Sequence, residues 1–228
     1  ESVVRLTVFP QRIRLSYVAG VFSVGTPAAL QIVLVSVSNS VMLRLMSGYV
    51  ESAVSGLGIA QKIEMIPFQI VQGLSSGVLP LIAYNYASGN RKRMDSAVRF
   101  SLAAGFAISV ILFAAVELSA PQLVRFFISD TATVEYGAVF TRLRCISLPF
   151  INIEFMLISV FQGIGGAKQA FVLSFFQKGI FDLPLMMLAN MLWPMYGLML
   201  TGPVMEFLGG SLAVFLYRRQ NLADRRAA

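Results

Sequence analysis

The sequence predicts an all-α membrane protein, and this prediction depends on composition, on the length of the apolar runs and on the placement of basic residues. The chain has 228 residues, of which 57% are hydrophobic and 13% are charged. Its mean hydropathy is +0.74. Soluble domains carry about 25% charged residues, so this chain has too few water-facing side chains for a protein in water. Lipid must therefore cover much of its surface.

Six apolar runs are long enough to cross a bilayer. A hydrocarbon core about 30 Å thick needs about 20 helical residues, and the sequence offers runs at 15–43, 56–84, 97–116, 138–161, 170–193 and 197–217. Their apolar residues do not alternate with polar ones, as those of a transmembrane β-barrel do. We therefore predict a six-span helical bundle over residues 15–217, a linker at 1–14 and a basic tail at 218–228.

The segments around these runs differ in character. The first two runs are longer than a bilayer requires, and Pro67 and Pro80 predict a bend in the second. Turns are expected at 88–90, where Ser, Gly and Asn follow one another, and at 163–168, where glycines cluster. The connection at 117–137 is long. Its PQLVRFFIS segment, which begins at Pro121, is expected to lie on the outer surface as an amphipathic piece.

The basic residues predict the orientation. Most of the 18 lie in the N-terminal segment, in the connections after the second and fourth runs, and in the C-terminal tail. These segments alternate with ones that are poor in basic residues, and cytoplasmic segments are the ones enriched in Lys and Arg. We therefore expect a multi-pass protein of the cell's inner or plasma membrane with both termini in the cytoplasm. The net charge of +7 then needs no nucleic-acid partner.

The inventory of reactive side chains argues against an enzyme. The sequence contains no histidine and one cysteine, Cys145. A zinc site, a Cys/His nucleophile pair and a Ser/His/Asp triad are therefore excluded. No GxxxxGK[ST] loop is present, so the chain does not bind ATP by that motif. We expect no metal site and no cofactor.

Ionisable residues inside apolar runs are expensive and mark candidate sites. Three of these acids lie near mid-span, Glu154, Asp182 and Glu206, and Glu64 lies in the outer third of the second run. Burial favours the neutral form of a carboxyl group, so these acids are candidates for ion or substrate binding. For Asp182 a static ion pair with Lys178, one turn away, is an equal alternative.

Amides accompany the acids. Gln61, Glu64 and Gln72 share one face of the second run, which suggests the wall of a wet cavity. The other candidates are Gln31 and Asn39 in the first run and Asn152 beside Glu154. The alternative for each amide is a hydrogen bond that joins two helices.

Three strings resemble multidrug and toxin extrusion (MATE) transporters. IPFQIVQGLSSGVLPLIAYNYASGNRKRM at 66–94 resembles the eighth span and the following loop of that family. VFQGIGGAKQA at 160–170 is similar to the exit of the tenth span, and YGLMLTGPVMEFLGG at 196–210 to the entry of the twelfth. The resemblance implies one lobe of a twelve-helix transporter, the C-terminal half, with the N-terminal six-helix half as its partner beside membrane lipids.

The same resemblance implies a function. MATE transporters export small cationic or amphipathic compounds in exchange for H⁺ or Na⁺ by alternating access. In one branch of the family a glutamate of the seventh span and an aspartate of the tenth bind the cation. These positions fall near Val35 and Ile151 here. We therefore expect H⁺ rather than Na⁺ as the coupling ion.

Two other functions stay open at this point. One is a six-span channel or structural membrane subunit that works as a homodimer, although the chain has no paired Asn-Pro-Ala and no TVGYG filter. The other is a flippase for lipid-linked intermediates from a related superfamily. Such proteins carry more basic residues in the cavity than the Lys62 and Lys178 expected here.

Overall fold

The described part of the chain is a bundle of helices. The computed structural model describes residues 33–176 and 181–227, and these contain no strand. The helices are Val33–Met46, α2 (Glu51–Ala87), α3 (Arg91–Phe127), α4 (Thr131–Cys145), α5 (Leu148–Gly163), α6 (Ala167–Phe175), α7 (Asp182–Leu192) and α8 (Tyr196–Ala227). The predicted linker at 1–14 lies outside the described residues.

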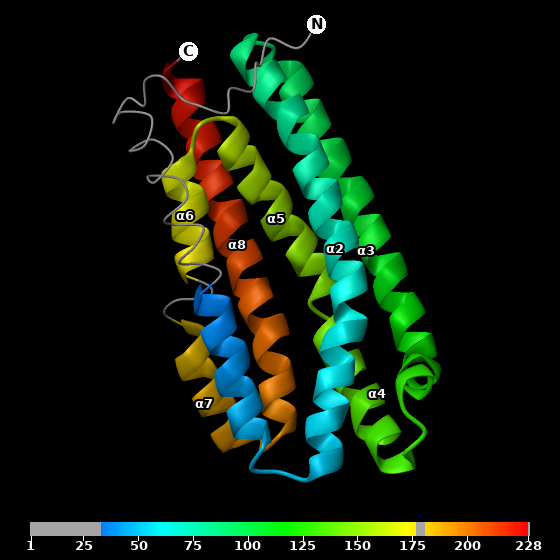
Figure 1. The fold of residues 1–228 in the computed structure, drawn as a ribbon. Coiled ribbons are helices and arrows are strands. Elements are labelled where there is room, and N and C mark those ends of the chain that lie inside the picture. The colour runs from blue at the N-terminus through cyan, green and yellow to red at the C-terminus, as the bar shows by residue number, and fades with distance from the viewer. Residues whose placement is uncertain (1–32, 177–180, 228) are drawn as a thin grey trace, which may run out of the picture.

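Helices α2 and α3 form a long antiparallel pair on one side of the bundle (Figure 1). The predicted turn at 88–90 joins them. Gly89 has φ +72°, which glycine adopts without strain. The side chain of Asn90 accepts a hydrogen bond from the backbone N–H of Arg93 and so caps α3. The predicted turn after α5 is also present, with Gly165 at φ +81°.

The connections fall at two ends of the bundle. Figure 1 shows the α2–α3 turn, the α5–α6 turn and the C-terminal end of α8 together at one end. The connection before α2 and the α3–α4 connection lie at the other end. Chain segments therefore run up and down between the two ends, as the alternation of connections rich and poor in basic residues predicts.

Helix α3 is longer than predicted, so the expected surface segment at PQLVRFFIS is wrong. The helix continues through Pro121 to Phe127, and α4 begins only four residues later. A proline leaves the carbonyl of the residue four positions earlier, here Glu117, without its helical partner. The guanidinium Nε of Arg142 donates to that carbonyl at 3.2 Å and replaces the missing helical hydrogen bond.

The fourth predicted span, 138–161, is a bent pair of helices. Helices α4 and α5 meet at an angle of 41°. Pro149 lies in the first turn of α5, where its missing N–H is harmless but the preceding helix cannot continue. The hydroxyl of Ser147 donates to the carbonyl of Arg144 at 2.7 Å and satisfies the broken end of α4.

The other predicted spans are recovered to different extents. The runs at 56–84 and 197–217 fall within α2 and α8. Helices α2, α3 and the part Tyr196–Gln220 of α8 are long and apolar enough to cross a membrane, and the α4–α5 pair adds a fourth span. The helices Val33–Met46 and α7 are apolar but shorter. The predicted extensions of these two runs include 15–32 and 177–180, which lie outside the described residues.

Glycines allow a close crossing of α2 and α4. Helix α2 packs on α3, α4 and α5, and α8 packs on α5 and α7. At the α2–α4 crossing a Cβ added to Gly56 would lie 2.9 Å from the backbone nitrogen of Gly137. The two backbones therefore touch without side chains between them, as in membrane helix pairs built on small residues.

Candidate functional site

A polar cavity lies where the helix Val33–Met46 meets α4, α7 and α8. Its volume is about 40 Å³, enough for a water molecule. The lining residues are Val35, Ser38, Asn39, Met42, Arg144, Asp182, Met186, Thr201 and Gly202. Two of the predicted site residues, Asn39 and Asp182, are therefore neighbours, although 143 positions separate them in the sequence (182 − 39).

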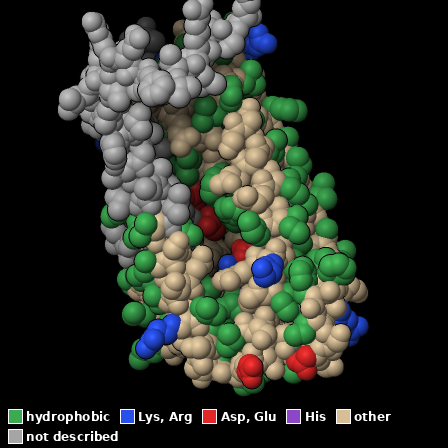
Figure 2. Space-filling view, in the orientation of Figure 1, with side chains coloured by type: hydrophobic (Ala, Val, Ile, Leu, Met, Phe, Trp, Pro, Cys, Tyr) green, Lys and Arg blue, Asp and Glu red, His purple; other side chains and the backbone are tan. Residues whose placement is uncertain are grey.

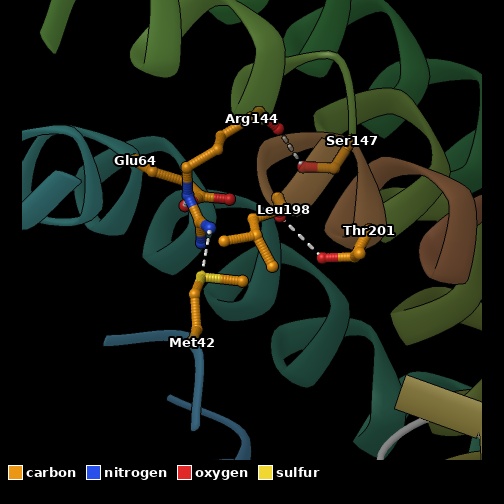
Figure 3. Close-up of polar contacts among 6 residues, drawn as sticks. All are labelled: Met42, Glu64, Arg144, Ser147, Leu198 and Thr201. Atoms are coloured by element: carbon orange, nitrogen blue, oxygen red, sulfur yellow. Dashed lines mark hydrogen bonds and ion pairs between the residues drawn. The ribbon is translucent and has the colours of Figure 1, made fainter. Parts of the chain in front are cut away.

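The guanidinium of Arg144 forms one wall of this cavity. Its Nε donates to Oε2 of Glu64 at 2.6 Å, and its Nη1 lies 3.4 Å from Sδ of Met42. Figure 3 shows this guanidinium between the Glu64 carboxylate and the Met42 sulfur. The side chains of Arg144 and Glu64 are only 13% and 16% exposed. A charge-assisted pair of this kind binds α2 to α4.

Asp182 supplies the acid of the cavity. It is the first residue of α7. It is 1% exposed. Its Oδ2 and the buried hydroxyl of Ser38 have no hydrogen-bond partner among the described residues. Thr201 donates its hydroxyl to the carbonyl of Leu198 at 2.7 Å, so its oxygen can still accept.

The charges around this cavity do not balance within the described residues. Glu64 and Asp182 bring two carboxylates, and Arg144 brings one guanidinium. A buried charge without a counter-charge is strongly disfavoured. Lys178, the predicted partner of Asp182, lies outside the described residues. The carboxylate, hydroxyl and amide oxygens of the lining are groups that can bind a small cation. Figure 2 shows acidic side chains at the bottom of a hollow on this face of the molecule.

Glu154 and Glu206 lie in a second place, at the contact between α5 and α8. Glu154 is fully buried and Glu206 is 6% exposed. The Glu154 carboxylate lies directly against Gly209 of α8, because its Cδ is 2.8 Å from where a Cβ on that glycine would be. Gly209 follows Glu206 by one helical turn, so both acids belong to one interface.

Asn152 lies next to Glu154 in sequence but faces another helix. It is fully buried, and its Nδ2 donates weakly to the carbonyl of Leu102 in α3 at 3.4 Å. Its Oδ1 has no partner among the described residues and lies against Gly105. This contact joins α5 to α3, which agrees with the alternative that the amide holds two helices together.

The face of α2 that carries Gln61, Glu64 and Gln72 lies against protein along much of its length. Glu64 is paired as described, and Phe68 packs edge-on against Phe155 of α5 with ring centroids 5.5 Å apart. Ser75 is buried and donates to the carbonyl of Val71 in its own helix at 3.0 Å. Gln61 and Gln72 are half-buried and outside the cavity lining. Gln31 falls outside the described residues.

Sequence reasoning missed Arg144. The expectation that Lys62 and Lys178 are the basic residues of the cavity is incomplete, because Arg144 lines it. Lys62 is exposed, and Lys178 lies outside the described residues. The available signal was an arginine inside a predicted apolar span, away from the basic connections. Its partner Glu64 is 80 positions away in the sequence, beyond any local pattern.

Known proteins share this fold. Multidrug export protein MepA of Staphylococcus saprophyticus is 27% identical over 208 residues, which cover 90% of this chain and 46% of that protein. The Vibrio cholerae MATE transporter VcmN in its bent form has a TM-score of 0.80 and 18% identity, covering 92% of this chain and 48% of VcmN. An outward-facing multidrug resistance MATE family transporter of the MOP superfamily has a TM-score of 0.84 and 16% identity. The match covers 100% of this chain and 51% of that transporter.

These similarities identify the family. The chain spans about half the length of the curated relatives that it matches. The MatE family model matches residues 27–188, which is more than half of the chain. The proteins of this family are transporters and not enzymes. The chain therefore belongs to the MatE family, and its fold is a six-helix bundle equivalent to one lobe of a twelve-helix MATE transporter.

Proposed function

We propose that this chain is the C-terminal six-helix half of a multidrug efflux transporter. With an N-terminal half it exports small cationic or amphipathic compounds by antiport against H⁺, in preference to Na⁺, with alternating access. The transporter lies in the cell's inner or plasma membrane, with both termini of this half in the cytoplasm and with lipid around its apolar surface. It needs no other cofactor.

Family membership carries this proposal, and the length of the match supports the assignment as a half. The curated relatives are named multidrug export proteins, and about half of their length aligns with this chain. Large apolar side chains stay exposed on α2 and α3, among them Ile66, Tyr84 and Phe100 at 65%, 70% and 75%. Lipid or a partner bundle is the surrounding that such a surface requires.

The buried acids support a cationic exchange partner. Asp182 lines a polar cavity with Asn39 and Ser38, while Glu154 and Glu206 lie at the α5–α8 interface. Acids at such positions bind a proton or a cation and release it when the environment changes. Aromatic and methionine side chains add adaptable contacts for an organic cation. The functional assignment of these residues is part of the proposal.

The test is dye efflux by the complete transporter in cells without their own pumps. The unmodified protein is expected to lower intracellular ethidium, a cationic dye. The variants Asp182→Asn, Glu154→Gln and Glu206→Gln are each expected to abolish efflux at normal membrane levels. Glu135→Gln, an exposed acid of α4, serves as the matched control. Efflux driven by a pH gradient without Na⁺ assigns the coupling ion. Unchanged transport in all three variants would show that the site assignment is wrong.

A further inference from the structure

Helix α5 carries two fully buried polar side chains that rest on glycines of neighbouring helices. Asn152 lies against Gly105 of α3, and Glu154 lies against Gly209 of α8. The two side chains are two residues apart and therefore point to nearly opposite sides of α5. Each glycine leaves, in the surface of its helix, a notch that the polar group fills.

The notch at Gly209 is specific to that position. A Cβ added there would overlap Oε2 of Glu154 and lie 2.8 Å from its Cδ. A Cβ added to the next residue, Gly210, would lie 3.5 Å from the carbonyl oxygen of Phe150, which is an ordinary contact. The two glycines share a helix and a local sequence, yet only Gly209 makes room for the acid.

Glycine at this position has a cost for α8. In a helix interior glycine is about 1 kcal/mol less favourable than alanine. Helix stability alone therefore favours alanine at 209, and the overlap with the Glu154 carboxylate is what opposes it. Because the side chain is fully buried, a turn of the carboxylate away from an added methyl group would change its position between the helices.

We propose that Gly209 is a positioning residue for Glu154. Its missing methyl group fixes the carboxylate against α8, one helical turn from Glu206, which is also buried. The two acids then act as one unit in binding the coupling ion. This inference depends on the proposed transport function, because it gives Glu154 a role in ion coupling.

The experiment compares adjacent alanine substitutions in the complete transporter. Gly209→Ala is expected to raise the coupling-ion concentration for half-maximal efflux about tenfold, or about 1.4 kcal/mol of binding free energy. Gly210→Ala brings the same gain in helix propensity and is expected to leave that concentration unchanged. A general packing defect would lower the amount of transporter in the membrane but would not shift its ion dependence.

A second substitution tests the contact itself. Glu154→Asp shortens the side chain by one methylene and removes the overlap with an alanine at 209. In the Gly209→Ala background, Glu154→Asp is expected to restore the ion dependence to that of Glu154→Asp alone. If Gly209→Ala does not accumulate in the membrane, recovery of its level by Glu154→Asp supports the notch. Absence of recovery overturns it.

Two failures can be told apart. If the unmodified transporter does not export dye, the proposed function is wrong, whatever the glycine variants do. If it exports dye and Gly209→Ala behaves like Gly210→Ala in ion dependence, the positioning role of Gly209 is wrong while the transport function stands.

Discussion

Two helix contacts of this bundle use glycine in different ways. At the α2–α4 crossing, Gly56 faces the backbone of Gly137, and an added Cβ would lie 2.9 Å from the backbone nitrogen there. At the α5–α8 contact, Gly209 faces the end of a side chain, the Glu154 carboxylate. The first contact brings two backbones together, and the second makes room for a functional group.

The difference between them lies in what can move. A backbone atom in a packed helix cannot shift without moving its helix, because protein interiors are close-packed. A carboxylate at the end of two methylene groups can turn, at the expense of its position. A methyl group at the first contact is therefore expected to affect stability, and one at the second to affect function.

The largest effect is expected at the backbone contact. Gly56→Ala forces α2 and α4 apart, and overpacking of this kind lowers stability by about 1–3 kcal/mol or more. Gly58→Ala is the control, because an added Cβ there has no neighbour within 4 Å. Thermal unfolding of the purified transporter measures both. A midpoint for Gly56→Ala as high as that of Gly58→Ala would contradict the proposed rigidity of the crossing.

A similar loss is expected when the ion pair of the same two helices is broken. Arg144→Met leaves Glu64 in a largely buried site without its counter-charge, and removal of one partner of a buried pair costs about 3 kcal/mol. The double substitution Arg144→Met with Glu64→Gln removes both charges and is expected to recover most of the loss. Chemical unfolding of the unmodified protein, the two single variants and the double variant gives the coupling free energy between Arg144 and Glu64. An additive cycle would mean that the pair contributes nothing.

A smaller effect is expected from the arginine that satisfies the proline-freed carbonyl in α3. Arg142 also lies 3.5 Å from the Glu117 carboxylate, and their side chains are 41% and 43% exposed. Solvent screens a pair of this exposure, so Arg142→Ala is expected to lower stability by about 1 kcal/mol, mainly through the lost backbone hydrogen bond. If Pro121→Ala restores the helical bond, it will make Arg142→Ala almost neutral in thermal unfolding.

The smallest effect is expected at the helix cap between α3 and α4. The hydroxyl and the backbone N–H of Thr133 donate to the Asp130 carboxylate at 2.7 and 2.8 Å. These bonds lower the pKa of the Asp130 carboxyl group. A lowered pKa in the folded state means that the stabilisation is present above the unfolded pKa. It is lost as the pH falls through the folded pKa.

Unfolding midpoints measured from neutral to acidic pH test this cap. The difference between the unmodified protein and Asp130→Asn is expected to shrink as the pH falls, because asparagine still caps α4 but has no charge. Asp130→Ala loses the cap at every pH. If the difference in unfolding midpoint between the unmodified protein and Asp130→Asn stays constant over the whole pH range, ionisation of the Asp130 carboxyl group does not contribute to stability.

Part of this architecture follows from the sequence because helices in lipid satisfy their own backbone. The run at 56–84 gave α2 in spite of Pro67 and Pro80, and the turn at 88–90 was marked by glycine and asparagine. Helix α3 could not be given its full length, since the residue that supports it at Pro121 is Arg142, which lies 25 positions from Glu117.

The site shows the same limit. Buried acids could be named from their cost in lipid, and three of the four, Glu154, Asp182 and Glu206, are almost fully buried. The fourth, Glu64, is paired with an arginine that no local spacing connects to it. Whether an acid in a span has a counter-charge depends on helix packing. The sequence can therefore list such acids but cannot tell which of them has a counter-charge.

The length of α2 and α3 has a practical consequence. Each has 37 residues and measures about 55 Å at 1.5 Å per residue, well beyond a hydrocarbon core about 30 Å thick. The tip that joins them, Ser88–Gly89–Asn90, is exposed, and a Cβ on Gly89 would meet no neighbour. We expect this tip to extend past the lipid and to accept an epitope tag or a fluorescent label, so that accessibility from one side of sealed vesicles reports which side it occupies.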